Sequence, residues 1–231
     1  MTLELRDIAL RQGSFQLQAD LSLARSGRYA VIGASGSGKS TLLSLLGGFL
    51  TPDRGRLFWN GDDITGLAPG HRPVSMLFQH HNLFPHLTVI QNVGMGLRPD
   101  LRLNRVQDER VAQVLDQVGL GGMQDRRPAA LSGGQQSRVA LARVLLRARP
   151  LLLLDEPFSA LGPALKAEML ALLSGIAADT GATVLMVTHD PADARSFAPD
   201  TVLVEEGRVH PPRPTGPLLD NPPPGLRAYL G

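Results

Sequence analysis

The chain has no cysteine and no long apolar run. Without cysteine it has neither a disulfide framework nor thiolate metal ligands, which fits a protein of the reducing cytosol. A membrane-spanning helix needs about 18 to 20 consecutive apolar residues, whereas the leucine run at 151–154 stops at an acid. We therefore expect the chain by itself to be soluble.

The sequence also lacks an excess of charge of either sign. The formal net charge is +2, from 23 basic and 21 acidic side chains. So near-neutral a balance favours neither nucleic acid nor an anionic membrane as a partner. Glu4 and Asp7 stand where a signal peptide has its basic region, so we expect no signal peptide. With 43% hydrophobic residues, the 231-residue chain can bury the core of one large domain, with or without an inserted subdomain.

A glycine-rich motif at residues 33–40 reads G-A-S-G-S-G-K-S. The apolar run at 29–32 predicts a strand before it and the leucines of 42–46 predict a helix after it, the context that the phosphate loop G-x-x-x-x-G-K-[ST] requires. Glycines bring backbone N–H groups close to an anion, and the helix dipole adds positive potential. A glycine-rich turn without a ligand is the alternative. We predict a nucleoside triphosphate site in which Lys39 contacts the β- and γ-phosphates and Ser40 ligates Mg²⁺.

Other segments predict a mixed sheet around this strand. Residues 15–23 alternate apolar and polar side chains, which is typical of an antiparallel sheet with one wet face. Further strands are predicted at 3–10, 56–59, 64–67, 74–78, 151–154, 182–188, 201–204 and 208–209, with a hairpin turn at 60–63. From Pro211 onward the chain is rich in proline, and we expect an extended or loosely docked tail that forms no packed sheet.

Residues 85–148 predict a helical insertion. An apolar stripe at roughly helical spacing lies in its middle: Val106, Val111, Val114, Leu115 and Val118. Near its end, L-S-G-G-Q at 131–135 precedes another helix, which Ser132 can cap, and the two glycines let an anion approach the helix N-terminus. A glycine-capped loop without a ligand is the alternative. The predicted units are a core of 1–84 and 149–210, the helical subdomain 85–148 and the tail 211–231.

Two of the predicted strands deliver polar residues at their carboxyl ends, where ligands bind in open α/β sheets. Asp155 and Glu156 follow the leucine run; the first acid suits Mg²⁺ and the second suits the attacking water. His189 follows the strand predicted at 182–188. A lone histidine is usually structural, but at this edge of the sheet a contact with the γ-phosphate is favoured.

The phosphate loop, Gln79, L-S-G-G-Q, the Asp-Glu pair and His189 stand in an order that resembles the nucleotide-binding subunit of ATP-binding cassette (ABC) transporters, over nearly the whole chain. Within that family, residues 72–79, 82–93, 96–103 and 151–161 are similar to the ATPase subunits of bacterial thiamine importers. Importers for iron, sulfate, molybdate or polyamines share much of the pattern. The resemblance implies an α/β P-loop NTPase fold: a RecA-like parallel core sheet, an N-terminal antiparallel β subdomain and an inserted α-helical subdomain.

The resemblance also implies a role for each motif. Two copies, head to tail, would sandwich two ATP molecules. One copy would hold the phosphates with Gly33, Ala34, Ser35, Gly36, Ser37, Gly38, Lys39, Ser40 and Thr41, and the other with Ser132, Gly133, Gly134 and Gln135. Mg²⁺ would be held by Ser40, Gln79 and Asp155. Hydrolysis would depend on Glu156, which polarises the water, together with His189, Lys39 and Gln79.

Two positions depart from the family pattern. Gly162 stands where the family has an aspartate that reaches across the dimer, which puts communication between copies in doubt and keeps open a nucleotide switch that hardly hydrolyses ATP. Where the family stacks an aromatic ring on adenine, this sequence has Arg11 and Gln12, and Phe15 is the nearest aromatic. Stacking is then weak or comes from Arg11, and ATP rather than GTP rests on the family alone.

The implied partners are a second copy of the chain and an integral-membrane permease at the cytoplasmic face of the inner membrane, with a periplasmic substrate-binding protein as an indirect partner. Phe84, Pro85 and His86 are candidates for the permease contact, with ordinary loop packing as the alternative. The rival class, a cassette protein that works on ribosomes or DNA, usually has two cassettes, a long coiled-coil insertion or a basic arm. We therefore expect no nucleic-acid partner.

Overall fold

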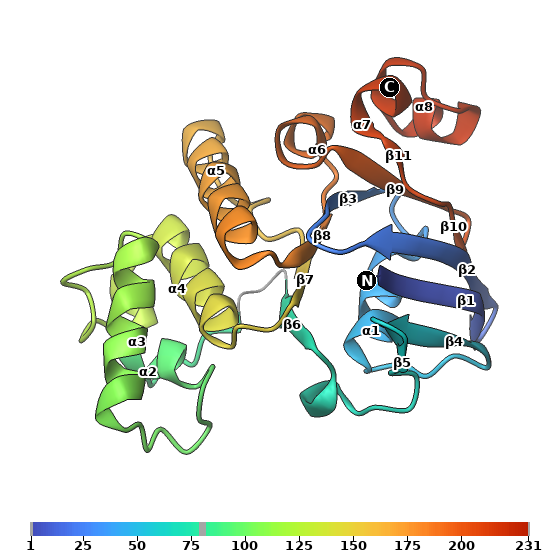
Figure 1. Ribbon diagram of the computed structural model, residues 1–231. Helices are drawn as coiled ribbons and strands as arrows, with labels where there is room; N and C mark the ends of the chain where they lie inside the picture. Colours follow the sequence, from blue (N-terminus) through green and yellow to red (C-terminus); the bar gives the residue numbers. More distant parts are fainter. Residues whose placement is uncertain (1, 79–81, 231) are drawn as a thin grey trace.

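A curved sheet of eleven strands is the frame of the structure (Figure 1). The computed structural model describes residues 2–78 and 82–230. The strands are β1 (Thr2–Gln12), β2 (Phe15–Ala24), β3 (Arg28–Ile32), β4 (Arg54–Trp59), β5 (Asp62–Asp63), β6 (Val74–Leu77), β7 (Leu151–Asp155), β8 (Thr183–Val187), β9 (Asp200–Glu205), β10 (Arg208–Val209) and β11 (Arg213–Pro214). The helices are α1 (Lys39–Gly47), α2 (Val89–Gly94), α3 (Arg105–Gln117), α4 (Gly133–Leu146), α5 (Pro163–Thr180), α6 (Pro191–Phe197), α7 (Thr215–Asp220) and α8 (Pro224–Leu230), with short 3₁₀ turns at Pro69–His71 and Pro128–Ala130.

The sheet has an antiparallel and a parallel part. Its order is β5-β4-β1-β2-β10-β9-β3-β8-β7-β6, with β11 paired to β9 off this path. β1 pairs antiparallel with β2 and β4, whereas β9, β3, β8, β7 and β6 run parallel to their neighbours in that series. This confirms the P-loop fold with a parallel core and an antiparallel N-terminal part.

The alternation of side chains along β7 shows how the sheet builds two cores. Leu151 and Leu153 face the leucines of α1, which the antiparallel strands enclose from the other side. Leu152 and Leu154 face the opposite way, toward apolar side chains of α5 and α6. Because both faces of this strand are covered, it is a continuous apolar run, as expected for a buried parallel strand.

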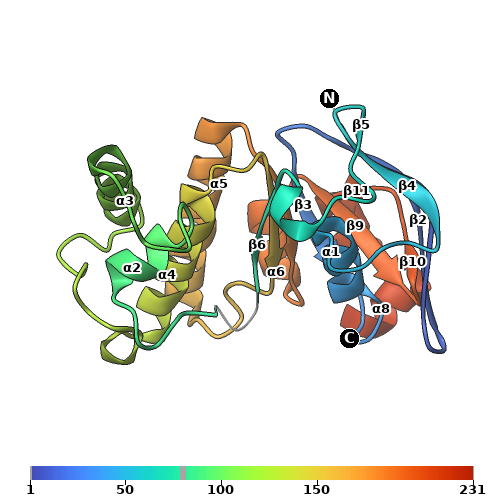
Figure 2. The same cartoon turned by 90° about the horizontal axis from the view of Figure 1, so that it is seen from below.

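The three helices α2, α3 and α4 form a separate lobe beside the sheet (Figure 2). They have their own apolar core, to which Val111 and Leu115 of α3 and Val139 of α4 contribute. α4 also sends Ala140 and Leu141 into the core on the sheet. This helix therefore belongs to two cores at once and joins the lobe to the sheet.

Two local predictions were wrong. The predicted strand at 64–67 is instead the two-residue strand β5 at Asp62–Asp63, because Asn60 and Gly61 both have positive φ, at 55° and 91°, and close the hairpin in two residues. Val106 does not belong to the buried stripe of α3, because its side chain is 65% exposed in the first turn of the helix.

The C-terminal prediction was also wrong. Residues 213–230 form β11, α7 and α8, and Leu218, Leu219 and Leu226 are buried in the core that covers the sheet. Proline does not prevent these short helices, because Pro224 opens α8 in the first turn, where a backbone N–H has no helical partner in any case. Within the described residues, the helices are all too short or too polar to cross a bilayer.

Candidate active site

The phosphate loop runs from β3 to α1, and glycine is required at two of its positions. Gly33 has φ 156°, and a Cβ there would lie 2.0 Å from the carbonyl oxygen of Val204 in β9. Gly38 has φ 111°, and a Cβ there would lie 2.8 Å from the Phe15 ring in β2. The loop passes so close to both strands that no side chain fits at these two points.

Lys39 begins α1 and turns its ammonium group back into the loop. Nζ donates hydrogen bonds to the carbonyl oxygens of Gly33, at 2.7 Å, and Ala34, at 2.8 Å. Burial lowers the pKa of the ammonium, while the carboxylates of Glu156 and Asp155 act in the opposite direction. The loop therefore holds its cation against two nearby carboxylates, in a position to meet an anion.

The N-terminus of α1 carries no side-chain cap. Gly38 is the N-cap residue, and the first turn contains no acid. The first N–H groups of a helix lack partners within it and lie at the positive end of the helix dipole. This end of α1 is thus open to an anionic ligand such as a phosphate.

Asp155 ends β7 beside the loop, as predicted. Burial raises the pKa of its carboxyl, and a hydrogen bond with the Ser40 hydroxyl works against that shift. A hydroxyl and a carboxylate held together are oxygen donors of the kind that Mg²⁺ takes along with phosphate oxygens and water. The donor set therefore fits Mg²⁺.

Glu156 follows directly and has a backbone conformation that is rare outside glycine, with φ 45°. Its N–H donates to the carbonyl oxygen of Val187 on the neighbouring strand at 3.2 Å. This turn brings its carboxylate, Oε2, to 3.1 Å from Nδ1 of His189. Such strain in a non-glycine residue is typical of functional sites, and here it places the acid and the imidazole together.

A cavity of about 520 Å³ lies over these groups. Its lining joins most of the residues predicted to bind nucleotide within one chain to two residues that flank the β1–β2 turn and one from the C-terminal helix: Gln12, Phe15, Ser35, Gly36, Gly38, Lys39, Ser40, Thr41, Glu156, His189 and Tyr229. Gly33, Ala34 and Ser37, also predicted to bind phosphate, do not line this cavity. Sequence reasoning missed Tyr229, because it lies in the tail that was expected to be loosely docked.

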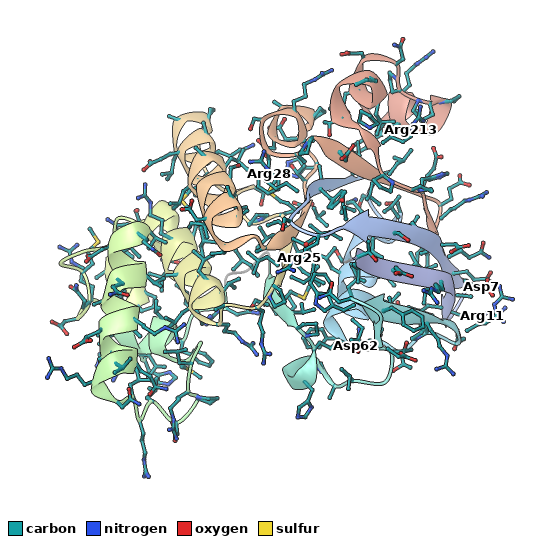
Figure 3. All side chains as sticks on the ribbon, in the orientation of Figure 1. Asp7, Arg11, Arg25, Arg28, Asp62 and Arg213 are labelled. Carbon is teal, nitrogen blue, oxygen red and sulfur yellow. The ribbon has the colours of Figure 1, made fainter. Side chains whose placement is uncertain are left out.

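Phe15 is the aromatic side chain that faces the cavity from the antiparallel sheet, together with Gln12. Arg11 lies elsewhere: it lines a different hollow next to Asp53, whose carboxylate accepts its backbone N–H at 2.7 Å. Figure 3 shows Arg11 at the outer edge of the antiparallel strands. Arg11 does not line the cavity over the phosphate loop, so Phe15 is the better placed of the two for a base, and stacking itself stays a prediction.

The L-S-G-G-Q residues lie at the N-terminus of α4, in the helical lobe. Ser132 accepts the backbone N–H of Gln135 at 3.3 Å, and the Gln135 amide oxygen accepts the backbone N–H of Ser132 at 3.0 Å. This reciprocal capping box confirms Ser132 as the helix cap. Among the described residues that line the cavity, none comes from this motif. Gln79 lies outside the described residues.

Comparison with known proteins agrees with this geometry. The family model described as ABC transporter matches residues 17–159. The thiamine import ATP-binding protein ThiQ of Cereibacter sphaeroides is 60% identical over 229 residues, covering 99% of both chains. The protein of the same name from Ruegeria sp. is 55% identical over 229 residues, again 99% of both.

Solved structures share the fold. The dimeric cassette MJ0796, bound to ADP and Pi in a post-hydrolysis state, superposes with a TM-score of 0.78 at 28% identity, over 92% of this chain and 98% of that one. The ADP conformation of the cassette MJ1267 superposes with a TM-score of 0.90 over 100% of this chain and 99% of that one, at 24% identity. The second likeness concerns the fold alone.

Proposed function

This chain belongs to the ABC transporter family, and on that premise we propose that it is the ATP-hydrolysing subunit of an importer for thiamine. The observation that carries the proposal is the cavity in which Lys39, Glu156 and His189 meet over an uncapped helix N-terminus. Thiamine as cargo is supported by the relatives named as thiamine import proteins, which match the chain from end to end.

The nucleotide would lie with its phosphates on the loop. Lys39 and the N–H groups of α1 would bind the β- and γ-phosphates, because both present donors that a terminal phosphate accepts. Ser40 and Asp155 would hold Mg²⁺, which when bound neutralises phosphate charge. Phe15 would contact the base from β2.

Hydrolysis would depend on Glu156 and His189. Glu156 would orient and polarise the attacking water, and His189 would hold the γ-phosphate. Oε2 of Glu156 and Nδ1 of His189 already lie 3.1 Å apart. Gln79, two positions after β6 in the sequence, would sense the water and Mg²⁺. Positioning of this kind supplies most of the rate in phosphoryl transfer, since little covalent chemistry is left to the protein.

A second copy would complete the site. The N-terminus of α4, with Ser132, Gly133, Gly134 and Gln135, would offer a second helix end to an anion from the other lobe, although its capping box already occupies the N–H of Gln135. Two chains arranged head to tail would bring this end onto the γ-phosphate of the partner's ATP. Residues 85–148 would then act as a subdomain, moving with the partner's nucleotide relative to the core of 1–84 and 149–210.

The permease would dock on an apolar surface next to the loop end of β6. Phe49 and Phe78 lie edge to face with their ring centroids 5.8 Å apart, and both are exposed, at 54% and 37%. Phe84 is also exposed, and the buried side chain of Asn92 fixes its backbone by a hydrogen bond at 2.8 Å. Clusters of exposed aromatics of this kind mark protein interfaces, and this one would place the chain at the inner face of the membrane.

The decisive experiment has two arms. Glu156→Gln should abolish phosphate release but keep ATP binding, so that gel filtration with ATP and Mg²⁺ shows a dimer. The control Glu156→Gln with Lys39→Ala should stay monomeric. A monomer across a wide concentration range would contradict the sandwich.

The second arm tests the cargo. The chain is reconstituted with its permease in vesicles, and thiamine uptake is measured against iron, sulfate, molybdate and a polyamine. ATP-dependent uptake of thiamine alone is expected. Uptake of another cargo would overturn the substrate but not the ATPase, and turnover too slow to measure with the permease present would favour the nucleotide switch.

A further inference from the structure

Tyr229, in the C-terminal helix α8, lines the same cavity as the phosphate loop. We propose that Tyr229 is a positioning residue for hydrolysis: it holds the backbone of His189 and so keeps the imidazole against Glu156. This inference rests on the proposed ATPase function. It adds to the site a residue that is distant in sequence from the phosphate loop and the other nucleotide-binding motifs.

The contacts form a chain of two steps. The Tyr229 hydroxyl donates a hydrogen bond to the carbonyl oxygen of His189 at 3.1 Å. The His189 ring then lies 3.1 Å from the Glu156 carboxylate. Burial raises the pKa of the Tyr229 hydroxyl, and the charges of Glu156 and Asp190 act in the same direction. The phenol therefore keeps its proton and stays a donor.

His189 needs such a hold because its own ring is 54% exposed and packing does not fix it. The residues around it are braced: Thr188 donates its N–H to Val31 at 3.2 Å, and the Asp190 carboxylate accepts a hydrogen bond from Lys166 at 2.9 Å. The Tyr229 hydroxyl bonds to the carbonyl oxygen of His189, which lies between these two hydrogen-bonded residues. The bond therefore restrains the backbone of His189 and with it the position from which the imidazole projects.

The position of Tyr229 is set by packing. Leu226, one helical turn earlier, is 1% exposed in the core that covers the sheet, and the Tyr229 ring packs against the same core. Gly225 lies against the side chain of Glu205, the last residue of β9, which places α8 beside this strand. The helix is thus seated on the sheet, and Tyr229 is carried to the cavity by it.

The test compares Tyr229→Phe, which removes only the hydroxyl, with Arg227→Ala, a change on the same helix at an exposed side chain that bonds to Pro222. We expect kcat for ATP hydrolysis to fall about fivefold in Tyr229→Phe, the size of one lost hydrogen bond, with KM within twofold of the unchanged chain. Arg227→Ala should change neither. In a His189→Ala background, Tyr229→Phe should have no further effect, because the group it positions is gone.

A second readout needs no turnover. In the nucleotide-free chain, the imidazole resonance of His189, assigned by its loss in His189→Gln, should shift in Tyr229→Phe and not in Arg227→Ala. An unchanged resonance together with unchanged kcat would overturn the inference, as would a rise in KM alone or an effect that adds fully to His189→Ala. If the unchanged chain did not hydrolyse ATP, the proposed function would fail while the resonance still decided the role of Tyr229.

Discussion

Two helix N-termini in this chain, for both of which we propose a phosphate contact, are built in different ways. α1 begins at Gly38 without any side-chain cap, so its N–H groups stay open over the cavity. α4 begins at Ser132, whose hydroxyl and the Gln135 amide close two of its donors in a reciprocal box. The N–H groups at the start of α1 are therefore available to a phosphate in the single chain. At the start of α4, the side chains of Ser132 and Gln135 already accept two N–H groups.

In the proposed dimer, this difference would keep the shared site inactive until two chains assemble. An open N-terminus costs stability, because its donors lack partners unless an anion arrives, whereas a capped one is stable alone. A phosphate that reaches α4 must compete with the Ser132 hydroxyl for the N–H of Gln135. The strong binding of ATP should therefore belong to α1, and α4 should contribute only when a second chain brings it close.

The largest effect should come from Lys39. Lys39→Ala removes the cation and leaves the N-terminus of α1 to act by itself, so kcat/KM for ATP hydrolysis should fall about 10³-fold, in line with the loss of one main electrostatic stabiliser. ATP affinity of the single chain, measured by calorimetry, should fall as well. Ser132→Ala is the matched change at the other helix and should leave that affinity within twofold; equal losses in both would break the comparison.

The next largest effect is expected on stability, from a substitution at the C-terminal end of α1. The buried guanidinium of Arg72 donates to the carbonyl oxygens of Leu45 and Leu46 at 2.6 and 2.9 Å, and to Leu67 and Thr65 as well. Arg72→Met leaves these acceptors without donors, and the free energy of unfolding should drop by about 2–3 kcal/mol. Urea unfolding measures it. Arg54→Met, at an exposed ion pair with Asp7, is the control and should change it by less than about 0.5 kcal/mol.

The cap of α4 should be worth less. Ser132→Ala opens the capping box and should lower the free energy of unfolding by about 1 kcal/mol. Gln135→Ala removes the reciprocal half and should cost a comparable or smaller amount. Urea unfolding of the nucleotide-free chain would show it. If neither variant were destabilised, the N-terminus of α4 would not be closed as the structure indicates.

The smallest effect should be a gain. Gly162 is the N-cap of α5, with φ −66° and open space where a Cβ would stand. Gly162→Asp supplies the missing cap, so the chain should become more stable by about 0.5 kcal/mol. A rise in melting temperature checks this, and Gly162→Ala, which reduces chain freedom without capping, separates the two contributions.

The features that could be predicted from the sequence are those that depend on residues close together in the chain. The phosphate loop, the cap at Ser132 and the two acids at the end of β7 depend on neighbours in the chain, and the structure places each as expected. The pairing of Glu156 with His189 also follows, because adjacent parallel strands end at one edge. Composition misled at the tail: Leu218, Leu219 and Leu226 are spaced among prolines, and packing rather than propensity makes their short helices. Because Tyr229 lies in this C-terminal segment, its place in the cavity was not predicted either.

The bonds from Arg72 tie the last turn of α1 to the segment that leads into β6. α1 has nine residues, a stiff rod of about 14 Å. Its first turn touches the nucleotide cavity, and Phe49, just past its last turn, belongs to the aromatic pair on the surface. A rigid helix that is displaced along its axis moves as a whole, so such a displacement of the phosphate loop would also displace the aromatic pair that we propose as the permease contact.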